Sequence, residues 1–262
     1  MVDQNIQKSA DMLWDAWNTN KPTTPIRELL GETDVEAAYA VQEINTKRWL
    51  EQGRRLSGRK IGLTSKAVQT QLGVDQPDYG MLFSDMDIPD GEEISFATCH
   101  QPKVEAEIAF VMGKDMDDPD VTTTEVMASI EYALPAIEVV GSRVADWNIR
   151  ITDTIADNAS SGLYVLGQTP VKIGDFDPRL CGMVLFNRGE PVSVGAGAAC
   201  LGSPINSTLW LARVMAKAGR PLKAGDVVLS GALGPMAAVT PGEVYEARIQ
   251  GLGSVRAAFS AE

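Results

Sequence analysis

Two glutamates in an apolar stretch are the first residues of this chain that could do chemistry. Residues 103–110 read Lys-Val-Glu-Ala-Glu-Ile-Ala-Phe, so polar and apolar side chains alternate along most of the stretch. This period of two is typical of a half-buried β-strand and places Glu105 and Glu107 on one face. For the pair alone, the ordinary interpretation is the solvent face of an antiparallel strand.

A third carboxylate changes that interpretation. Glu138 stands in a second strand-like run, Pro-Ala-Ile-Glu-Val-Val at residues 135–140, which leaves it no polar face. Burying a carboxylate is costly unless a cation or hydrogen-bond donors compensate it. Three oxygen ligands without His or Cys suit a hard divalent cation, so we expect Glu105, Glu107 and Glu138 to bind Mg²⁺ or Mn²⁺.

Composition restricts the class of protein and its partners. The chain has 262 residues and a formal net charge of −12. This length allows one large domain or two small ones, and the acidic charge argues against a nucleic-acid partner. Neither a signal peptide nor an apolar run of about 18 residues is present, which predicts a cytoplasmic protein without a membrane partner. The three separated cysteines indicate neither a disulfide framework nor a zinc site.

The elements that must position the glutamates fall into two regions. Residues 1–56 show helical periodicity, with one helix over residues 5–17 and a second that a Thr33–Glu36 capping box opens and Gly53 ends. Residues 57–262 are rich in strands, which predicts an α+β fold with a mixed sheet in a roll or barrel-like core. The two regions either form separate parts or one continuous domain. A further helix is expected from Ser203 to Gly219.

A lysine and a turn lie between these regions. Residues 58–65 predict a short strand that carries Lys60 and runs into a helix over residues 65–72, with Gly73 as its cap. The amides around residues 63–66 would then face an anion. Residues 74–80 are interpreted as a turn-rich loop in which Asp78 is a turn residue. The single histidine, His100, is an ordinary strand-entry residue or lies close to the glutamate strand.

Several blocks together resemble a known family, and they occur in that family's order over nearly the whole chain. The chain is similar to the 2-hydroxypenta-2,4-dienoate hydratases of aromatic meta-cleavage pathways, within the fumarylacetoacetate hydrolase superfamily. The blocks are residues 58–64 (Gly-Arg-Lys-Ile-Gly-Leu-Thr), 73–80 (Gly-Val-Asp-Gln-Pro-Asp-Tyr-Gly), 104–110, 134–143, 157–160 (Asp-Asn-Ala-Ser) and 231–236 (Gly-Ala-Leu-Gly-Pro-Met).

The resemblance implies a role for each site residue. Glu105, Glu107 and Glu138 would hold one Mg²⁺ or Mn²⁺, and Lys60 would be an acid/base residue partnered by Asp78. The backbone at Leu63, with Thr64 beside it, and the hydroxyl of Ser160 would bind the substrate carboxylate. The implied reaction adds water to 2-hydroxypenta-2,4-dienoate, through its 2-oxo-3-enoate tautomer, to give 4-hydroxy-2-oxopentanoate.

Other activities stay open at this point. The sister enzyme 4-oxalocrotonate decarboxylase shares the acidic positions and the Asp-Asn-Ala-Ser block, although residues 141–147 and 231–236 favour a hydratase. A hydratase of a longer dicarboxylate and a non-catalytic partner subunit are further alternatives. The family's members are homo-oligomers, so we expect one here, with association with other meta-cleavage enzymes left open. The substrate's chain length, the preferred metal and the number of subunits are also open.

Overall fold

The computed structural model describes residues 3–66, 69–70 and 74–262. The α-helices are α1 (Gln4–Thr19), α2 (Arg27–Leu30), α3 (Val35–Glu51), α5 (Thr123–Ser129), α6 (Ile151–Ala156) and α7 (Pro204–Lys217). The strands are β1 (Leu56–Gly62), β2 (Asp78–Phe83), β3 (Asp87–Pro89), β4 (Glu93–Ile94), β5 (Lys103–Met112), β6 (Ile130–Val140), β7 (Leu163–Leu166), β8 (Gly182–Asn187), β9 (Glu190–Ala196), β10 (Val227–Leu229), β11 (Ala237–Ala238), β12 (Val244–Ile249) and β13 (Gly253–Phe259).

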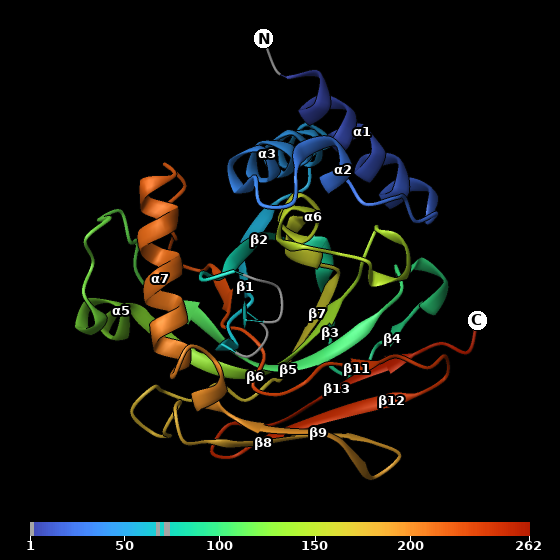
Figure 1. Cartoon of the computed structure of the whole chain (residues 1–262). Coiled ribbons are helices and arrows are strands. Elements are labelled where there is room, and N and C mark those ends of the chain that lie inside the picture. The colour runs from blue at the N-terminus through green and yellow to red at the C-terminus, as the bar shows by residue number, and fades with distance from the viewer. Residues whose placement is uncertain (1–2, 67–68, 71–73) are drawn as a thin grey trace.

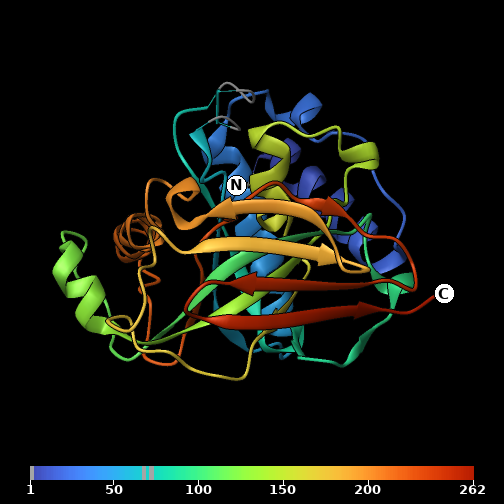
Figure 2. The same cartoon turned by 90° about the horizontal axis from the view of Figure 1, so that it is seen from below.

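Two β-sheets form the centre of the molecule. The larger sheet has the order β2-β1-β10-β5-β6-β7-β3, with β11 also paired to β5, and it curls into a half-barrel (Figure 1). The smaller sheet has the order β4-β13-β12-β8-β9 and lies below the larger one in Figure 1, and its strands face the viewer in Figure 2. The pairing of β1 with β10 is parallel, whereas β10–β5, β5–β6 and β6–β7 are antiparallel. The prediction of an α+β fold with a mixed, roll-like sheet is confirmed.

The two faces of β5 point into different environments. Val104, Ala106 and Ile108 are buried in the main hydrophobic core together with side chains of the smaller sheet. Because side chains alternate along a strand, Glu105 and Glu107 project from the opposite, concave face. Burying the apolar face between the sheets therefore fixes the direction in which the two glutamates point.

Helices cover the concave face. The helices α1 and α3 pack on each other, and α3 packs on α6, above the opening of the half-barrel (Figure 1). A second hydrophobic cluster joins Leu13, Ala38 and Val41 to Ile151 and Ile155 of α6. Since this cluster combines both regions, the division into residues 1–56 and 57–262 stays a prediction. No helix in the described ranges is long and apolar enough to cross a bilayer.

Three local predictions have different outcomes. The helix expected at Ser203 begins as predicted, because the Ser203 side chain accepts a hydrogen bond from the Ile205 amide. The capping box at Thr33 is wrong, since α3 begins one residue later and Oδ1 of Asp34 accepts from the Ala37 amide at 2.9 Å. The cap at Gly73 and half of the helix predicted over residues 65–72 lie outside the described residues.

The loop predicted over residues 74–80 is wrong at its end. From Asp78 the chain enters β2, a fully buried strand that pairs with β1. The turn residues that precede β2 favour a loop in the sequence pattern. The strand is defined by its pairing with β1, which lies about 20 residues earlier, and no local pattern reveals that pairing. Asp78 is therefore a buried strand residue and not a turn residue.

Candidate metal centre and substrate cavity

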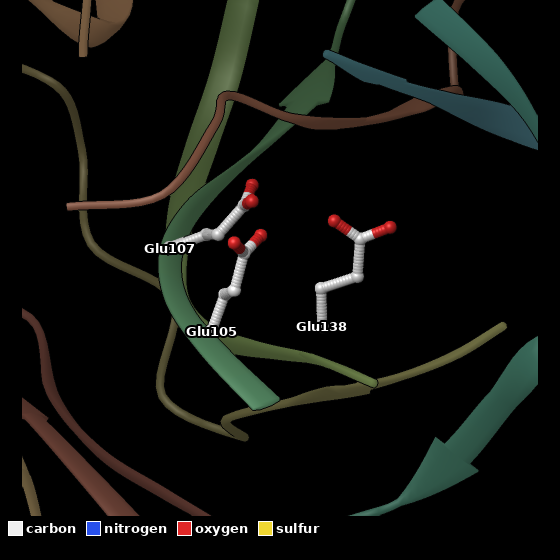
Figure 3. Close-up of side chains that lie close together, drawn as sticks. All are labelled: Glu105, Glu107 and Glu138. Carbon is white, nitrogen blue, oxygen red and sulfur yellow. The ribbon is translucent and has the colours of Figure 1, made fainter. Parts of the chain in front are cut away.

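The register between β5 and β6 brings the three glutamates together. Glu105 pairs directly with Glu138 across the two strands, and Glu107 is two residues further along β5 on the same face. One carboxylate oxygen from each residue lies within 4.8 Å of the other two. The three side chains reach into one common space (Figure 3). Residues distant in sequence thus form a compact set of oxygen ligands.

Three buried carboxylate oxygens of this cluster accept no hydrogen bond from the described residues. Glu107 and Glu138 are each 1% exposed, whereas Glu105 is partly exposed. The Gly231 amide donates to Oε2 of Glu107 at 2.8 Å. Within the described residues, Oε1 of Glu107 and both oxygens of Glu138 accept no hydrogen bond. Buried carboxylates without donors are costly unless a cation lies between them.

The electrostatics of the cluster lead to the same conclusion. Burial, together with the charge of Glu105, raises the pKa of Glu138 to about 7, although Lys60 opposes the shift. Burial and the charges of Glu138 and Glu105 raise the pKa of Glu107 well above its ordinary value. Burial also raises the pKa of Glu105. A bound dication would remove this repulsion, so the residues fit one Mg²⁺ or Mn²⁺ held by oxygen ligands.

Lys60 borders the cluster from β1. Its side chain is buried, its Nζ lies 3.3 Å from Oε1 of Glu138, and it donates to the carbonyl oxygen of Ala159 at 2.9 Å. Burial alone lowers the pKa of Lys60, but the surrounding carboxylates, Glu138 foremost, raise it above its ordinary value overall. Lys60 is therefore a buried ammonium group that is protonated at neutral pH and held at a fixed position.

Asp78 lies beside this lysine because Gly62 has no side chain. Asp78 pairs with Gly62 across β2 and β1. A Cβ on Gly62 would lie 2.2 Å from Oδ1 of Asp78 and 3.5 Å from Nζ of Lys60. Burial raises the pKa of Asp78, whereas Lys60 lowers it. The structure thus brings the predicted pair of Lys60 and Asp78 to the same point, although their catalytic roles stay a prediction.

A left-handed turn directs further polar groups at this point. Asn158, Ala159 and Ser160 have φ values of 54°, 53° and 56°, which are sparsely populated for residues other than glycine. The side chain of Asn158 holds the turn on β2, because it accepts from the Met81 amide and donates to the Met81 carbonyl. The turn thereby presents the Ala159 carbonyl to Lys60.

Ser160, at the end of this turn, belongs to a chain of hydroxyl groups. Its Oγ lies 3.1 Å from Oγ1 of Thr154, and Thr154 donates to Oδ2 of Asp78 at 3.5 Å. Both hydroxyl-bearing residues are buried. Ser160 is therefore linked to the carboxylate of Asp78 through Thr154.

A cavity of about 530 Å³ opens beside Glu105. Leu63 and Thr64, two of the predicted substrate-binding residues, line it, whereas the third, Ser160, is not among its lining residues. Their roles in substrate binding stay a prediction. In the part of the chain that the structure describes, Glu105 is the one charged residue that lines the cavity. The other side of the cavity is mainly apolar and consists of Val194, Gly195, Ala199, Ala232, Leu233, Gly234, Pro235 and Met236. The cavity thus joins an acidic end to an apolar one.

His100 lies elsewhere. Its ring stacks on Trp17 with a centroid distance of 5.3 Å, and it lines a separate cavity of about 230 Å³. Burial and the nearby Arg143 lower the pKa of His100 to about 4. His100 is therefore neutral at pH 7, and a role close to the glutamates finds no support among its contacts.

Comparisons with known proteins identify the family. The family described as fumarylacetoacetate (FAA) hydrolase C-terminal matches residues 55–260. The chain belongs to the fumarylacetoacetate hydrolase family. Curated relatives include the TodF product hydratase of Pseudomonas putida strain F1, which is 64% identical over 97% of this chain and 95% of the relative. The 2-keto-4-pentenoate hydratase of Paraburkholderia xenovorans strain LB400 is 55% identical over 99% and 96%.

A solved structure of this family shares the whole fold. The 4-oxalocrotonate decarboxylase of Pseudomonas putida G7, in complex with magnesium and adipate, aligns with a TM-score of 0.92. It is 33% identical, and the alignment covers 97% of each chain. The chain is thus a full-length match to a family member that was solved with a divalent cation.

Sequence reasoning missed several residues of this family site. Gly231, which donates to Glu107, stood only as part of a matching block, and its positive φ was not foreseen. Ala159 acts through its carbonyl oxygen, which no side-chain pattern reveals. Thr154 lies in α6, a helix too short for periodicity to predict. The position of Val194 in the cavity wall also carried no signal.

Proposed function

We propose that this chain is a metal-dependent hydratase of the meta-cleavage pathway. It adds water to 2-hydroxypenta-2,4-dienoate and yields 4-hydroxy-2-oxopentanoate. The observation that carries the proposal is the convergence of Glu105, Glu107 and Glu138 beside Lys60 and Asp78, at the acidic end of a cavity. The hydratase names of curated relatives at 55–64% identity over nearly the whole chain support it.

The residues at the acidic end bind and orient the substrate. Glu105, Glu107 and Glu138 would hold a divalent cation, which would supply a Lewis acid for the 2-oxo acid end of the substrate. The backbone of Leu63 and Thr64 and the hydroxyl of Ser160 hold the carboxylate. With these groups fixed, we expect carbons 3 to 5 to extend toward the apolar side of the cavity and Lys60 to face the reacting atoms.

Lys60 and Asp78 move the protons. In the first step the 2-hydroxyl loses its proton to Asp78, and carbon 5 gains one from Lys60, which gives the 2-oxo-3-enoate. In the second step the oxygen of water bonds to carbon 4 while its proton passes to the now neutral Lys60, and carbon 3 takes up the proton that Asp78 carries, so both residues return to their initial states. Proton transfer by positioned groups contributes about 10²–10⁴-fold to such rates.

The apolar cavity distinguishes this reaction from the alternatives. A dicarboxylate such as oxalocrotonate needs a cationic or polar partner for its second carboxylate. Among the described residues that line the cavity, none carries a positive charge, and Glu105 would repel a second anion that lies close to it. We therefore place the hydratase of a monocarboxylate before both the decarboxylase and the hydratase of a longer dicarboxylate.

A substrate panel tests the proposal. The purified chain is incubated with 2-hydroxypenta-2,4-dienoate, its six-carbon homologue 2-hydroxyhexa-2,4-dienoate and 4-oxalocrotonate, each with Mn²⁺ or with chelator. We expect loss of dienoate absorbance and a mass increase of one water for the first two substrates, with Mn²⁺ only. Release of CO₂ from oxalocrotonate without hydration would establish the decarboxylase instead. No turnover of any substrate would leave a non-catalytic partner subunit.

Assembly and location complete the proposal. We propose a cytoplasmic homo-oligomer, and the exposed apolar side chains of Leu180, Val192 and Val244 are consistent with an interface between copies. We also propose association with other meta-cleavage enzymes, because these enzymes form its substrate or use its product. Light scattering on the purified chain measures the number of subunits, and a mass equal to one chain would contradict the oligomer.

A further inference from the structure

One peptide group connects a buried thiol to a glutamate of the metal centre. The amide of Gly231 donates to Oε2 of Glu107 at 2.8 Å. The carbonyl of the same peptide group, which belongs to Ser230, accepts from Sγ of Cys200 at 2.8 Å. Because a peptide group is planar, a contact at its carbonyl restrains the direction of its N–H. Cys200 and Glu107 thus act on opposite ends of one rigid unit.

The peptide group has little room to move elsewhere. Gly231 has a φ of +112°, and a Cβ there would lie 2.5 Å from the side chain of Thr64. Thr64 and Gly231 follow β1 and β10, which are parallel neighbours, so both lie at the same edge of the sheet. The Leu201 amide donates to the Thr64 carbonyl at 3.0 Å, which fixes the segment that carries Cys200 against the same edge.

The start of α7 holds the thiol in place. Cys200 is fully buried, and its Sγ lies 3.3 Å from Oγ of Ser207. Ser207 in turn donates to the Pro204 carbonyl in the first turn of the helix. Burial raises the pKa of Cys200 to about 12, so the thiol keeps its proton at neutral pH and remains a donor. A series of contacts therefore connects α7 to Glu107, through the Cys200 thiol and the Ser230–Gly231 peptide group.

We propose that Cys200 is a positioning residue of the metal centre, which orients Glu107 through the Ser230–Gly231 peptide group. Without the thiol, the buried Ser230 carbonyl has no other hydrogen-bond donor among the described residues. The peptide group is then less restrained, and so is the Glu107 carboxylate that its N–H holds. Groups that orient metal ligands typically change metal affinity or activity 10–100-fold when they are removed. This inference rests on the proposed metal centre.

The other interpretation is that Cys200 only fills space. A purely packing role predicts lower stability in any smaller variant and an unchanged affinity for metal. Cys181 offers a matched control, because it is also buried and its Sγ contacts a backbone carbonyl, that of Pro178, at 3.5 Å. None of the contacts of Cys181 leads to the glutamates.

Mn²⁺ titration by calorimetry separates the two interpretations. We expect Cys200→Ala and Cys200→Val, of which the second fills the space that the sulfur leaves, to bind Mn²⁺ about tenfold more weakly than the natural chain. Cys200→Ser, which keeps a donor, and Cys181→Ala should bind within about twofold of it. Unfolding temperatures in chelator report any loss of packing separately, and whichever of the Ala and Val variants folds provides the comparison.

Two outcomes overturn the inference in distinguishable ways. If the natural chain binds Mn²⁺ and Cys200→Ala or Cys200→Val binds it equally well, the positioning role of Cys200 is wrong, and the metal centre is unaffected. If the natural chain binds no Mn²⁺, both the metal centre and the positioning role are wrong.

Discussion

Glu105 and Glu138 face each other directly across β5 and β6, so two carboxylates of like charge occupy one cross-strand pair. Opposed like charges destabilise an antiparallel pair, and here burial adds to the cost. Lys60 contacts Oε1 of Glu138, but one ammonium does not neutralise the cluster. The cluster therefore keeps an excess of negative charge that a divalent cation would neutralise. Because this effect acts on metal affinity and stability, the site can be tested without any substrate.

Replacing Glu107 by Gln should have opposite effects with and without metal. In chelator, the variant removes one of the repelling carboxylates, so we expect a higher unfolding temperature than that of the natural chain. With Mn²⁺, the variant should lose most of the stabilisation that binding provides and bind the ion at least about tenfold more weakly. Thermal unfolding in chelator and in a Mn²⁺ series measures both effects.

The control for this variant lies on β6. Glu131 is an exposed glutamate whose carboxylate pairs with Lys172 at the surface, and Glu131→Gln should change neither the metal dependence nor the unfolding temperature by much. Equal responses to Mn²⁺ in the natural chain and in Glu107→Gln would count against the three-glutamate centre.

Replacing Lys60 by Met should separate turnover from metal binding. The change keeps the length of the side chain but removes the ammonium group that lies 3.3 Å from Glu138. We expect kcat to fall about 10²–10⁴-fold, as for the loss of a positioned proton donor. Mn²⁺ affinity should stay equal or rise, because a positive charge leaves the cluster. Steady-state kinetics and calorimetry measure the two, and unchanged turnover would remove Lys60 from the mechanism.

The sequence could predict the three glutamates, because each lies in a strand long enough for its pattern to be visible, and Glu138 has only apolar neighbours. It could not predict the environment of Asp78 from composition, since β2 is defined by its pairing with β1. Thr154, Ala159 and Cys200 act through hydroxyl, carbonyl and thiol contacts between distant segments. Such contacts depend on the packed structure and leave no periodic signal.

Metal affinity should depend on pH around neutrality. The pKa of Glu138 is raised from 4.5 to about 7, so a proton competes with the cation below pH 7. We expect the affinity for Mn²⁺ to fall about tenfold per pH unit between pH 7 and pH 5 for each displaced proton. In chelator, stability has the opposite pH dependence to metal affinity, because the folded chain binds the Glu138 proton more tightly than the unfolded chain does. The free energy of unfolding then decreases as pH rises from 4.5 to 7.

The variant Glu138→Gln checks this assignment. It should flatten the pH dependence of stability in chelator, because the titrating group is gone. Unfolding in urea at half-unit pH steps provides the measurement. An unchanged slope in the variant would assign the titration to another group.

His100 should contribute the opposite dependence at lower pH. Its pKa is lowered to about 4, so the folded chain holds the neutral ring between pH 6.5 and pH 4 while the unfolded chain takes up a proton. Stability from this residue is complete above pH 6.5 and is lost as pH falls toward 4. His100→Phe, which keeps a ring for stacking on Trp17, should reduce this acid-induced loss. An identical acid profile in both proteins would exclude His100 as its source.

Met236 should determine whether the cavity accepts a second carboxylate. It is 44% exposed and lines the apolar part of the cavity, where the distal end of a longer substrate would lie. In Met236→Arg a guanidinium group becomes available to that carboxylate, and a charge-assisted hydrogen bond contributes about 1.5–3 kcal/mol. Solvent screening at this exposed position reduces the benefit to about tenfold in kcat/KM for a dicarboxylate dienoate. Activity on the monocarboxylate should fall or stay unchanged.

Met127→Arg is the matched control, because Met127 is 43% exposed on α5 and is not among the residues that line the cavity. A gain for the dicarboxylate in Met127→Arg, or none in Met236→Arg, would show that the apolar wall does not select the substrate.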